Sequence, residues 1–423
     1  MRMDIFIRDL KRKKIVIVGG GFGGIEIAKR INTNRFDVLL IDKHNYFTFQ
    51  PLLYQVATGG LEPDSVAYPL RKIISKNKSV VFRLAEVKSV LPATNEISTN
   101  IGVIPYDILI LACGSATNFF GMKGTEENGL ALKSVTDSLN MRSFILQNFE
   151  AALLAKDENE RKRLMNFVIV GGGPTGVEIS GALSELKRHV LPNDYPELDL
   201  SMMNITIIES GGDTLAAMSE FARRNSAKQL KQLGVNLLLN SQLVSYDGNE
   251  AILKDETVIQ TSSLIWTAGV MGNLPGGFRP DLIVKGNRLT VDEYNKVIGY
   301  ENIYAIGDMA AVDGSPHPML APVAMQQGKN LAKNLNRKEG EAWKKFKYFD
   351  KGTMATIGRS RAVADLKFIH LKGFFAWMAW LFIHLMLLVG FRNRVIVLIN
   401  WFWNYFSYDR AIRLIIRPYR KNK

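Results

Sequence analysis

The chain has 423 residues, 47% of them hydrophobic, which is enough for two or three domains with buried cores. Its single cysteine, Cys113, excludes an intrachain disulfide and a redox cysteine pair, and it favours a reducing compartment. The net charge of +14 suggests an anionic partner, either nucleic acid or an anionic lipid surface. No nucleic-acid-binding motif accompanies the charge, so we expect lipid and no nucleic acid.

The first element is a strand that runs into a glycine-rich turn. The β-branched run Ile15 to Val18 predicts a buried parallel strand, and a helical stretch follows the turn. Gly19, Gly21 and Gly24 have the spacing G-x-G-x-x-G, which allows a tight turn, a close approach to a diphosphate and close helix packing. Asp42 ends the next apolar run, about 20 residues further on, where an acid accepts from a ribose 2′-OH. Together these features favour a dinucleotide site over an ordinary turn.

The same pattern occurs a second time in the middle of the chain. Gly171, Gly173 and Gly176 form the second turn, and Glu209 takes the place of the acid. Each copy is followed, after a similar interval, by another apolar run that ends in glycine. This similarity indicates one nucleotide-binding unit used twice. Two dinucleotide sites in one chain indicate electron transfer between FAD and a nicotinamide dinucleotide.

Two segments are expected to be irregular. Residues 47–63 are apolar but contain two prolines and two glycines, so we expect a shaped loop over a ligand; an ordinary buried connection is nearly as well supported. Residues 187–203 lengthen the second unit relative to the first and should form a surface insertion. In contrast, Phe221 to Leu233 predicts an amphipathic helix that ends at Gly234.

The C-terminal part combines apolar helices with a basic tail. Gly373 to Phe391 carries no charge except titratable His384 and is barely long enough to cross a bilayer. Helical spacing places Trp377, Trp380, His384 and Leu388 on one stripe, as in a helix lying in the membrane interface. Between 392 and 423, eight basic residues and one acid alternate with large aromatics. We expect monotopic attachment to the cytoplasmic face of the inner membrane, with a single spanning helix over 373–391 as the alternative.

Five motifs extend the pattern over the whole chain. They are FQPLLYQVATGGL at 49–61, GGGPTGVE at 171–178, AIGDMA at 305–310, APVAMQQGK at 321–329 and KGTMATIGRSRAVADL at 351–366. With these motifs the chain resembles the type II NADH:quinone oxidoreductases, flavoenzymes that feed electrons into the respiratory chain at the membrane without pumping protons.

The resemblance implies an α/β fold with two Rossmann-like dinucleotide-binding domains and a C-terminal membrane-associating helical segment. The expected domains are an FAD-binding domain in two parts (1–117 and 276–340), an NADH-binding domain (118–275) and a membrane-associating region (341–423).

The resemblance also assigns roles to individual residues. It implies that non-covalent FAD contacts five positions: Gly19, Gly21, Gly24, Asp42 and Asp308. It implies that NADH, the substrate, contacts three more: Gly173, Gly176 and Glu209. The charge of Glu209 independently favours NADH over NADPH, because a carboxylate repels a 2′-phosphate. Asp308 is also suited to capping a following helix, a role compatible with the first.

Four further residues are expected to act on the quinone or on electron transfer. The resemblance implies that Gln326 and Gln327 contact the quinone; without it, exposed glutamines at a helix start would be the simpler interpretation. Glu178 is suited to facing the nicotinamide and flavin, but a carboxylate in a first helical turn is favourable anyway. Lys351 is suited to supplying a proton when desolvated, although a surface lysine before a glycine turn is somewhat better supported. We expect no metal site.

Several other classes of protein also combine a flavin with a nicotinamide dinucleotide. Disulfide reductases and sulfide:quinone reductases need cysteines that this chain lacks. A soluble NADH-dependent reductase of a protein electron carrier would leave the C-terminus unexplained. A flavin-based redox sensor or membrane scaffold is an alternative that is not an enzyme. Turnover with a quinone would distinguish an enzyme from such a protein. The choice between ubiquinone and menaquinone, and the formation of a homodimer, stay open.

Overall fold

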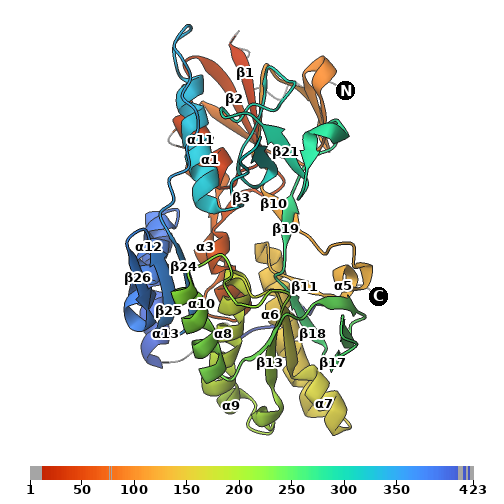
Figure 1. The fold of residues 1–423 in the computed structure, drawn as a ribbon. Helices are drawn as coiled ribbons and strands as arrows, with labels where there is room; N and C mark the ends of the chain where they lie inside the picture. Colours follow the sequence, from red (N-terminus) through yellow and green to blue (C-terminus); the bar gives the residue numbers. More distant parts are fainter. Residues whose placement is uncertain (1–11, 76, 78, 408–412, 416–417, 420–423) are drawn as a thin grey trace. The chain divides into compact units, whose positions relative to one another are not determined.

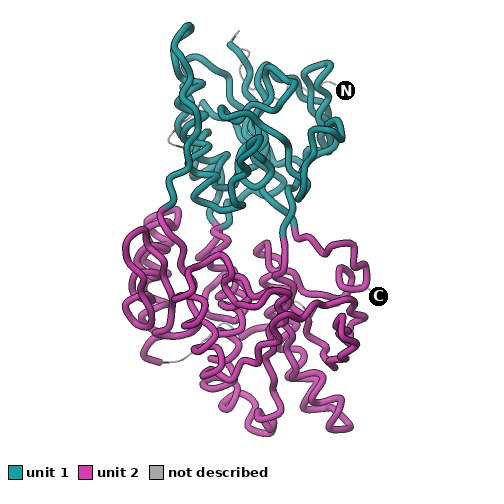
Figure 2. Tube along the Cα trace, in the orientation of Figure 1, with its two compact units in different colours: residues 1–48, 68–116, 270–350 teal, residues 49–67, 117–269, 351–423 magenta. Residues whose placement is uncertain are grey.

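The computed structural model describes residues 12–75, 77, 79–407, 413–415 and 418–419 (Figure 1). The chain divides into two compact units (Figure 2). Unit 1 holds residues 1–48, 68–116 and 270–350, and unit 2 holds residues 49–67, 117–269 and 351–423. Unit 2 thus includes the segment 49–67, which the predicted boundaries put with the FAD-binding part. The assignment of one cofactor to each unit stays a prediction.

Unit 1 is built on a five-stranded parallel sheet in the order β22-β9-β1-β2-β5. These strands are β1 (Lys13–Val18), β2 (Phe36–Asp42), β5 (Val80–Leu84), β9 (Ile108–Leu111) and β22 (Ile303–Ala305). Ile15, Val16 and Ile17 are fully buried, as expected of a central parallel strand covered on both faces. The helices of this unit are α1 (Phe22–Arg30), α4 (Leu70–Ile74) and α11 (Ala321–Leu335).

Shorter strands surround this sheet. Two three-stranded sheets consist of β6 (Val87–Leu91), β7 (Glu96–Thr99) and β8 (Gly102–Pro105), and of β20 (Ile283–Val284), β21 (Arg288–Val291) and β23 (Ala310–Val312). The remaining short strands are β3 (Tyr46–Thr48), β4 (Ala67–Pro69), β10 (Ser115–Thr117) and β19 (Val270–Gly272).

Unit 2 repeats the main sheet of unit 1. Its parallel order is β11-β18-β12-β13-β14. The strands are β11 (Leu130–Ala131), β12 (Asn166–Val170), β13 (Asn204–Glu209), β14 (Asn236–Leu239) and β18 (Ser263–Trp266). The four strands after the edge strand therefore correspond one to one in the two units. This topology confirms the predicted duplication and the α/β class.

The helices and minor sheets of unit 2 complete the fold. The helices are α2 (Leu53–Ala57), α3 (Pro63–Val66), α5 (Lys123–Asn128), α6 (Val135–Leu154), α7 (Glu158–Leu164), α8 (Pro174–His189), α9 (Leu191–Asp194), α10 (Glu220–Gln232), α12 (Gly373–Leu387) and α13 (Phe391–Ser407). The minor antiparallel sheets are β15 (Leu243–Tyr246), β16 (Glu250–Leu253) and β17 (Val258–Gln260), and β24 (Thr353–Gly358), β25 (Arg361–Leu366) and β26 (Ile369–Lys372). The predicted helix before Gly234 is confirmed as α10.

The two segments expected to be irregular contain short regular elements. Residues 50–57 form a 3-10 turn and the helix α2, and Leu52, Val56 and Ala57 are buried, which agrees with the alternative of a buried connection. The expected surface insertion at 187–203 begins with the last turn of α8, and Leu191 and Met203 anchor it to the core. Pro192 and Pro196 are exposed, as expected of a surface segment.

The apolar C-terminal stretch is two helices and not one. α12 ends at Leu387, and Gly390 has a positive φ of 89° before α13 begins. Over the residues that the structure describes, no helix combines the length and the apolar content needed to cross a membrane. The helix that was the alternative over 373–391 is therefore shorter than predicted, because α12 has 15 residues and ends at Leu387, while α13 begins at Phe391. Lys423 and most of the basic tail lie outside the described residues.

The predicted interfacial stripe faces inward. Trp380 is only 1% exposed and Leu388 is buried, because this face of α12 packs within unit 2. The exposed apolar side chains lie on other faces of α12 and α13. They are Phe374, Phe375, Met378, Phe382, Met386, Leu387, Phe391, Val395, Leu398, Ile399, Phe402, Trp403 and Phe406.

Candidate functional site

The first glycine turn has the geometry of a diphosphate cradle. Gly19 adopts a positive φ of 106°, and a Cβ on Gly24 would overlap the carbonyl oxygen of Gly19. A Cβ on Gly21 would meet nothing within 4 Å, so open space lies above the turn. The Asp42 carboxylate accepts a hydrogen bond of 2.6 Å from the backbone N–H of Gly20.

The second turn reproduces this geometry in unit 2. Gly171 has a φ of 109°, a Cβ on Gly176 would overlap the carbonyl oxygen of Gly171, and Gly173 faces open space. One oxygen of Glu209 accepts from the N–H of Gly172 at 2.6 Å, and the other accepts from Gly211 at 2.7 Å.

The carboxylates of Asp42 and Glu209 therefore each accept a hydrogen bond from the glycine turn of their own unit. The spacing of the motifs does not predict this role. A carboxylate has about four acceptor positions, so each retains capacity for a ribose hydroxyl. The residues present fit a dinucleotide in each unit.

Asp308 lies in a 3-10 turn (Gly307–Met309) that follows β22, a strand of the five-stranded sheet of unit 1. The Ser115 hydroxyl donates a hydrogen bond to its carboxylate. The element after it is the strand β23, so the predicted helix-capping role is wrong. Open α/β sheets bind their ligands beyond the carboxyl ends of their strands, and Asp308 follows the carboxyl end of β22, which agrees with a flavin-side role.

The two glutamines lie in the second turn of α11, and neither is an exposed helix-start residue. Gln327 is 1% exposed, and its side-chain oxygen accepts from the N–H of Gly307 at 2.6 Å. Gln326 exchanges two hydrogen bonds, 2.9 and 3.0 Å, with the backbone of Phe349. Gln327 thus supports the turn that carries Asp308, while Gln326 fastens a later segment to α11.

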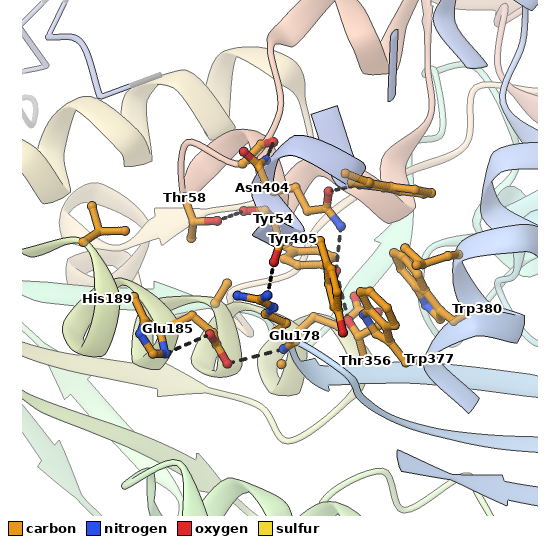
Figure 3. A pocket seen from close by; sticks show the side chains of 18 residues that line it. Tyr54, Thr58, Glu178, Glu185, His189, Thr356, Trp377, Trp380, Asn404 and Tyr405 are labelled. Carbon is orange, nitrogen blue, oxygen red and sulfur yellow. Dashed lines mark hydrogen bonds and ion pairs between the residues drawn. The ribbon is translucent and has the colours of Figure 1, made fainter. Parts of the chain in front are cut away.

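A cavity of about 130 Å³ lies within unit 2 (Figure 3). Its walls come from α2 and the turn after it, α8, the end of β24, α12 and α13. Glu178 on α8 faces it, with Tyr54, Thr356 and Trp380 around it. These residues come from four separate segments, so the cavity exists only in the folded chain.

Burial sets the protonation of Glu178. Glu178 is only 9% exposed, and this burial raises the pKa of its carboxyl well above the usual value. The backbone of Thr356 and the indole of Trp380 act weakly in the opposite direction, although the Trp380 Nε1–H does not meet hydrogen-bond geometry. Glu178 is the fifth residue of α8, and the first turn of this helix carries no acidic residue, so its predicted place in the first turn is wrong and the dipole explanation no longer applies.

Polar contacts hold the C-terminal helices against this site. Trp401 Nε1 donates to the Gln55 side chain at 2.8 Å, and Gln55 in turn donates to the Tyr54 hydroxyl at 3.0 Å. The Tyr54 hydroxyl also bonds to Thr356 Oγ1 at 2.9 Å. Asn393 in α13 donates to the backbone carbonyl of Asp64 at 2.9 Å. The roles of these residues in holding the helices could not be predicted from the pattern of the motifs. An asparagine inside an apolar helix, such as Asn393, is the one feature of the sequence that indicates such a contact.

Two other residues have surface or core roles. Lys351 is exposed and does not line the described cavity, which favours its surface interpretation. Burial raises the pKa of the Cys113 thiol to about 12, and its Sγ lies 3.6 Å from the carbonyl oxygen of Val18. A thiol with a raised pKa is a poor nucleophile, which indicates a packing role for Cys113 without redox function.

Comparisons with known proteins identify the class. Residues 13–328 match the family "Pyridine nucleotide-disulphide oxidoreductase", and residues 351–407 match "NDH2 C-terminal domain". The structure of NDH2 from Plasmodium falciparum in complex with NADH has a TM-score of 0.87, covers 96% of this chain and 100% of its own, and is 23% identical, so it shows the fold. The fold is that of a two-dinucleotide oxidoreductase.

Curated relatives narrow the class to one family. The chain is 34% identical to the type II NADH:quinone oxidoreductase Ndh of Mycobacterium tuberculosis, over 95% of this chain and 90% of the relative. It is 32% identical to a mitochondrial internal alternative NAD(P)H-ubiquinone oxidoreductase of Arabidopsis thaliana, over 92% and 84%. The chain belongs to the type II NADH:quinone oxidoreductase family, which confirms the resemblance seen in its motifs.

Proposed function

We propose that this chain oxidises NADH and passes two electrons through FAD to a membrane quinone, without proton pumping. The observation that carries the proposal is the coexistence of two glycine turns with a separate cavity that contains a buried acid and is walled by the C-terminal helices. A soluble reductase of a protein carrier, or a sensor, needs neither the cavity nor these helices.

The dinucleotides are divided between the two glycine turns. FAD lies on the first, held by Gly19, Gly21, Gly24, Asp42 and Asp308, and residues 1–117 and 276–340 form its domain. NADH lies on the second, held by Gly173, Gly176 and Glu209 within residues 118–275. Bound FAD supplies the hydride acceptor and the two-electron donor. The chain orients both ligands through backbone N–H groups and helix N-termini.

Glu209 selects NADH over NADPH. Its carboxylate stands at the end of β13, where an adenosine ribose is recognised, and it is already held by the N–H groups of Gly172 and Gly211. A fixed negative charge at that position repels a 2′-phosphate.

The quinone head group occupies the cavity, and Glu178 donates a proton to a carbonyl oxygen. Because burial raises the pKa of this carboxyl well above its usual value and so favours the protonated form, Glu178 is suited to act as a general acid. Gln326 and Gln327 serve the same half-reaction from α11. Lys351 is the weakest assignment, since its exposure gives no reason for proton donation.

The exposed apolar side chains of α12 and α13 dock on lipid. This docking makes residues 341–423 the membrane-associating region and gives monotopic attachment to the cytoplasmic face. Nearby basic residues add about 1 kcal/mol each on anionic lipid. Labelling of Lys423 from outside sealed, right-side-out vesicles would overturn that placement. A homodimer stays a prediction, tested by light scattering in detergent.

Stopped-flow spectroscopy of the purified protein tests the proposal. Anaerobic NADH should bleach the flavin, and soluble ubiquinone or menaquinone analogues should restore its colour. Glu178→Gln should slow reoxidation roughly 100-fold and leave reduction unchanged. A colourless protein that added FAD does not restore, or a variant slowed only in reduction, would contradict the proposal.

A further inference from the structure

One face of α8 carries acidic and imidazole groups from the buried end of the cavity to its edge. Glu178, Ala182, Glu185 and His189 are spaced by four, three and four residues, so they share one face of the helix. All four line the cavity (Figure 3).

The polar side chains of this face differ in exposure, and His189 is the most exposed of them. Glu178 is 9% exposed, the Glu185 side chain is 12% exposed, and the His189 side chain is 39% exposed. The His189 Nε2 lies 3.7 Å from a carboxylate oxygen of Glu185. The other oxygen of Glu185 accepts from the backbone N–H of Arg359 at 3.3 Å. Glu185 is therefore held in the cavity wall, while His189 reaches solvent.

The reaction needs a proton from water. NADH, one proton and a quinone give NAD⁺ and a quinol: the hydride carries two electrons and one proton, and the second proton on the quinol comes from solvent. A buried acid that gives up its proton must be reprotonated in every turnover. Glu178 has little exposure of its own, so it needs a path.

We propose that His189 and Glu185 form this path and deliver solvent protons to the cavity that contains Glu178. The inference rests on the proposed quinone function. His189 takes a proton from water and passes it to the Glu185 carboxylate. Seven residues of helix separate Glu185 from Glu178 by about 10 Å, too far for direct transfer. Once the quinol has left, the cavity of about 130 Å³ has room for a few waters, which complete the path and allow Glu178 to be reprotonated before the next quinone binds.

The surroundings of the path carry few competing charges. The guanidinium of Arg359 lies 4.3 Å from the ring centroid of Tyr405 and bonds to the Tyr405 backbone carbonyl, which directs it toward α13. Arg188, next to His189, donates to the carbonyl of Gln232 at the end of α10. Tyr54 from α2 completes the titratable groups among the residues lining the cavity.

An ordinary helix-surface pair is the competing explanation, because histidine and glutamate four residues apart often attract each other weakly. Unit 2 contains a natural comparison. His370 Nδ1 lies 2.7 Å from the Asp365 carboxylate, a closer contact, but neither residue lines the cavity. His370→Gln is therefore a matched control for His189→Gln.

Steady-state oxidation of NADH by excess quinone, measured with the holoenzyme between about pH 6 and pH 9, tests the path, because Glu178 must be reprotonated between turnovers. His189→Gln and Glu185→Gln should lower kcat about tenfold or more at high pH and less at low pH, where hydronium replaces the path. His189→Ala should regain rate with added imidazole, which a structural defect would not. Flavin reduction by NADH should stay unchanged, and His370→Gln should match the wild type.

The outcomes separate the path from the function. A wild-type rate and pH profile in His189→Ala, without response to imidazole, would overturn the path and leave the proposed function intact. Failure of the wild-type enzyme to reduce quinone would overturn both. If Glu185→Gln does not fold, His189→Ala at the cavity edge decides the question alone.

Discussion

Alanine at the third glycine of each turn should separate the two dinucleotide sites. In Gly24→Ala the new Cβ would overlap the carbonyl oxygen of Gly19. In Gly176→Ala it would overlap that of Gly171 and lie 2.9 Å from Thr267 Oγ1. Because the overlap is with backbone, the helix must move away from the strand, at a cost of about 1–3 kcal/mol.

If this cost falls on the ligand-bound turn, affinity drops by roughly 5- to 150-fold at the altered site. Gly24→Ala should lose FAD, measured by absorbance after gel filtration. Gly176→Ala should keep FAD and bind NAD⁺ weakly, measured by calorimetry. Gly276→Ala is the control, since its Cβ would make only ordinary contacts of 3.5 Å or more. Loss of FAD from Gly176→Ala with unchanged NAD⁺ affinity would refute the assignment of the turns.

Three further predictions concern single side chains. Gln327→Leu leaves the half-buried N–H of Gly307 without this acceptor and should lower the free energy of unfolding by about 1 kcal/mol, measured by urea denaturation; an unchanged value would show that the N–H finds another acceptor. Trp380→Ala should lower the free energy of unfolding by about 3–5 kcal/mol, because the side chain is buried. Phe375→Ser changes a side chain that is 76% exposed, so it should leave stability unchanged and weaken binding to anionic vesicles about tenfold. Vesicle binding equal to that of the wild type would contradict the proposed docking face. Burial raises the folded-state pKa of Glu178. Above about pH 4.3 the unfolded chain releases this proton while the native protein still binds it. The free energy of unfolding therefore falls as pH rises toward the folded-state pKa. Glu178→Gln should remove this loss and be the more stable form at pH 8, measured by denaturation at several pH values; a parallel pH dependence of the two proteins would contradict the burial argument.

The cavity illustrates what could not be predicted from the sequence. The sequence places Glu178 shortly after the second glycine turn, and this position is compatible with catalysis and with helix stabilisation. Its raised pKa depends on what covers it, and the covering groups come from α2, β24 and α12. Tyr54 and Thr356 bond to each other across about 300 positions of the chain, and no local period encodes such a contact.

The two strand–turn–helix units could be predicted from the sequence, because each depends on neighbouring residues: β-branched strands, a glycine with positive φ and a glycine at the helix–strand contact. The helical period likewise predicts which residues share a face of α12. Which of these faces is covered depends on the folded chain. Trp380 lies on the covered face and Phe375 on the open one, because burial depends on the partners that the rest of unit 2 supplies.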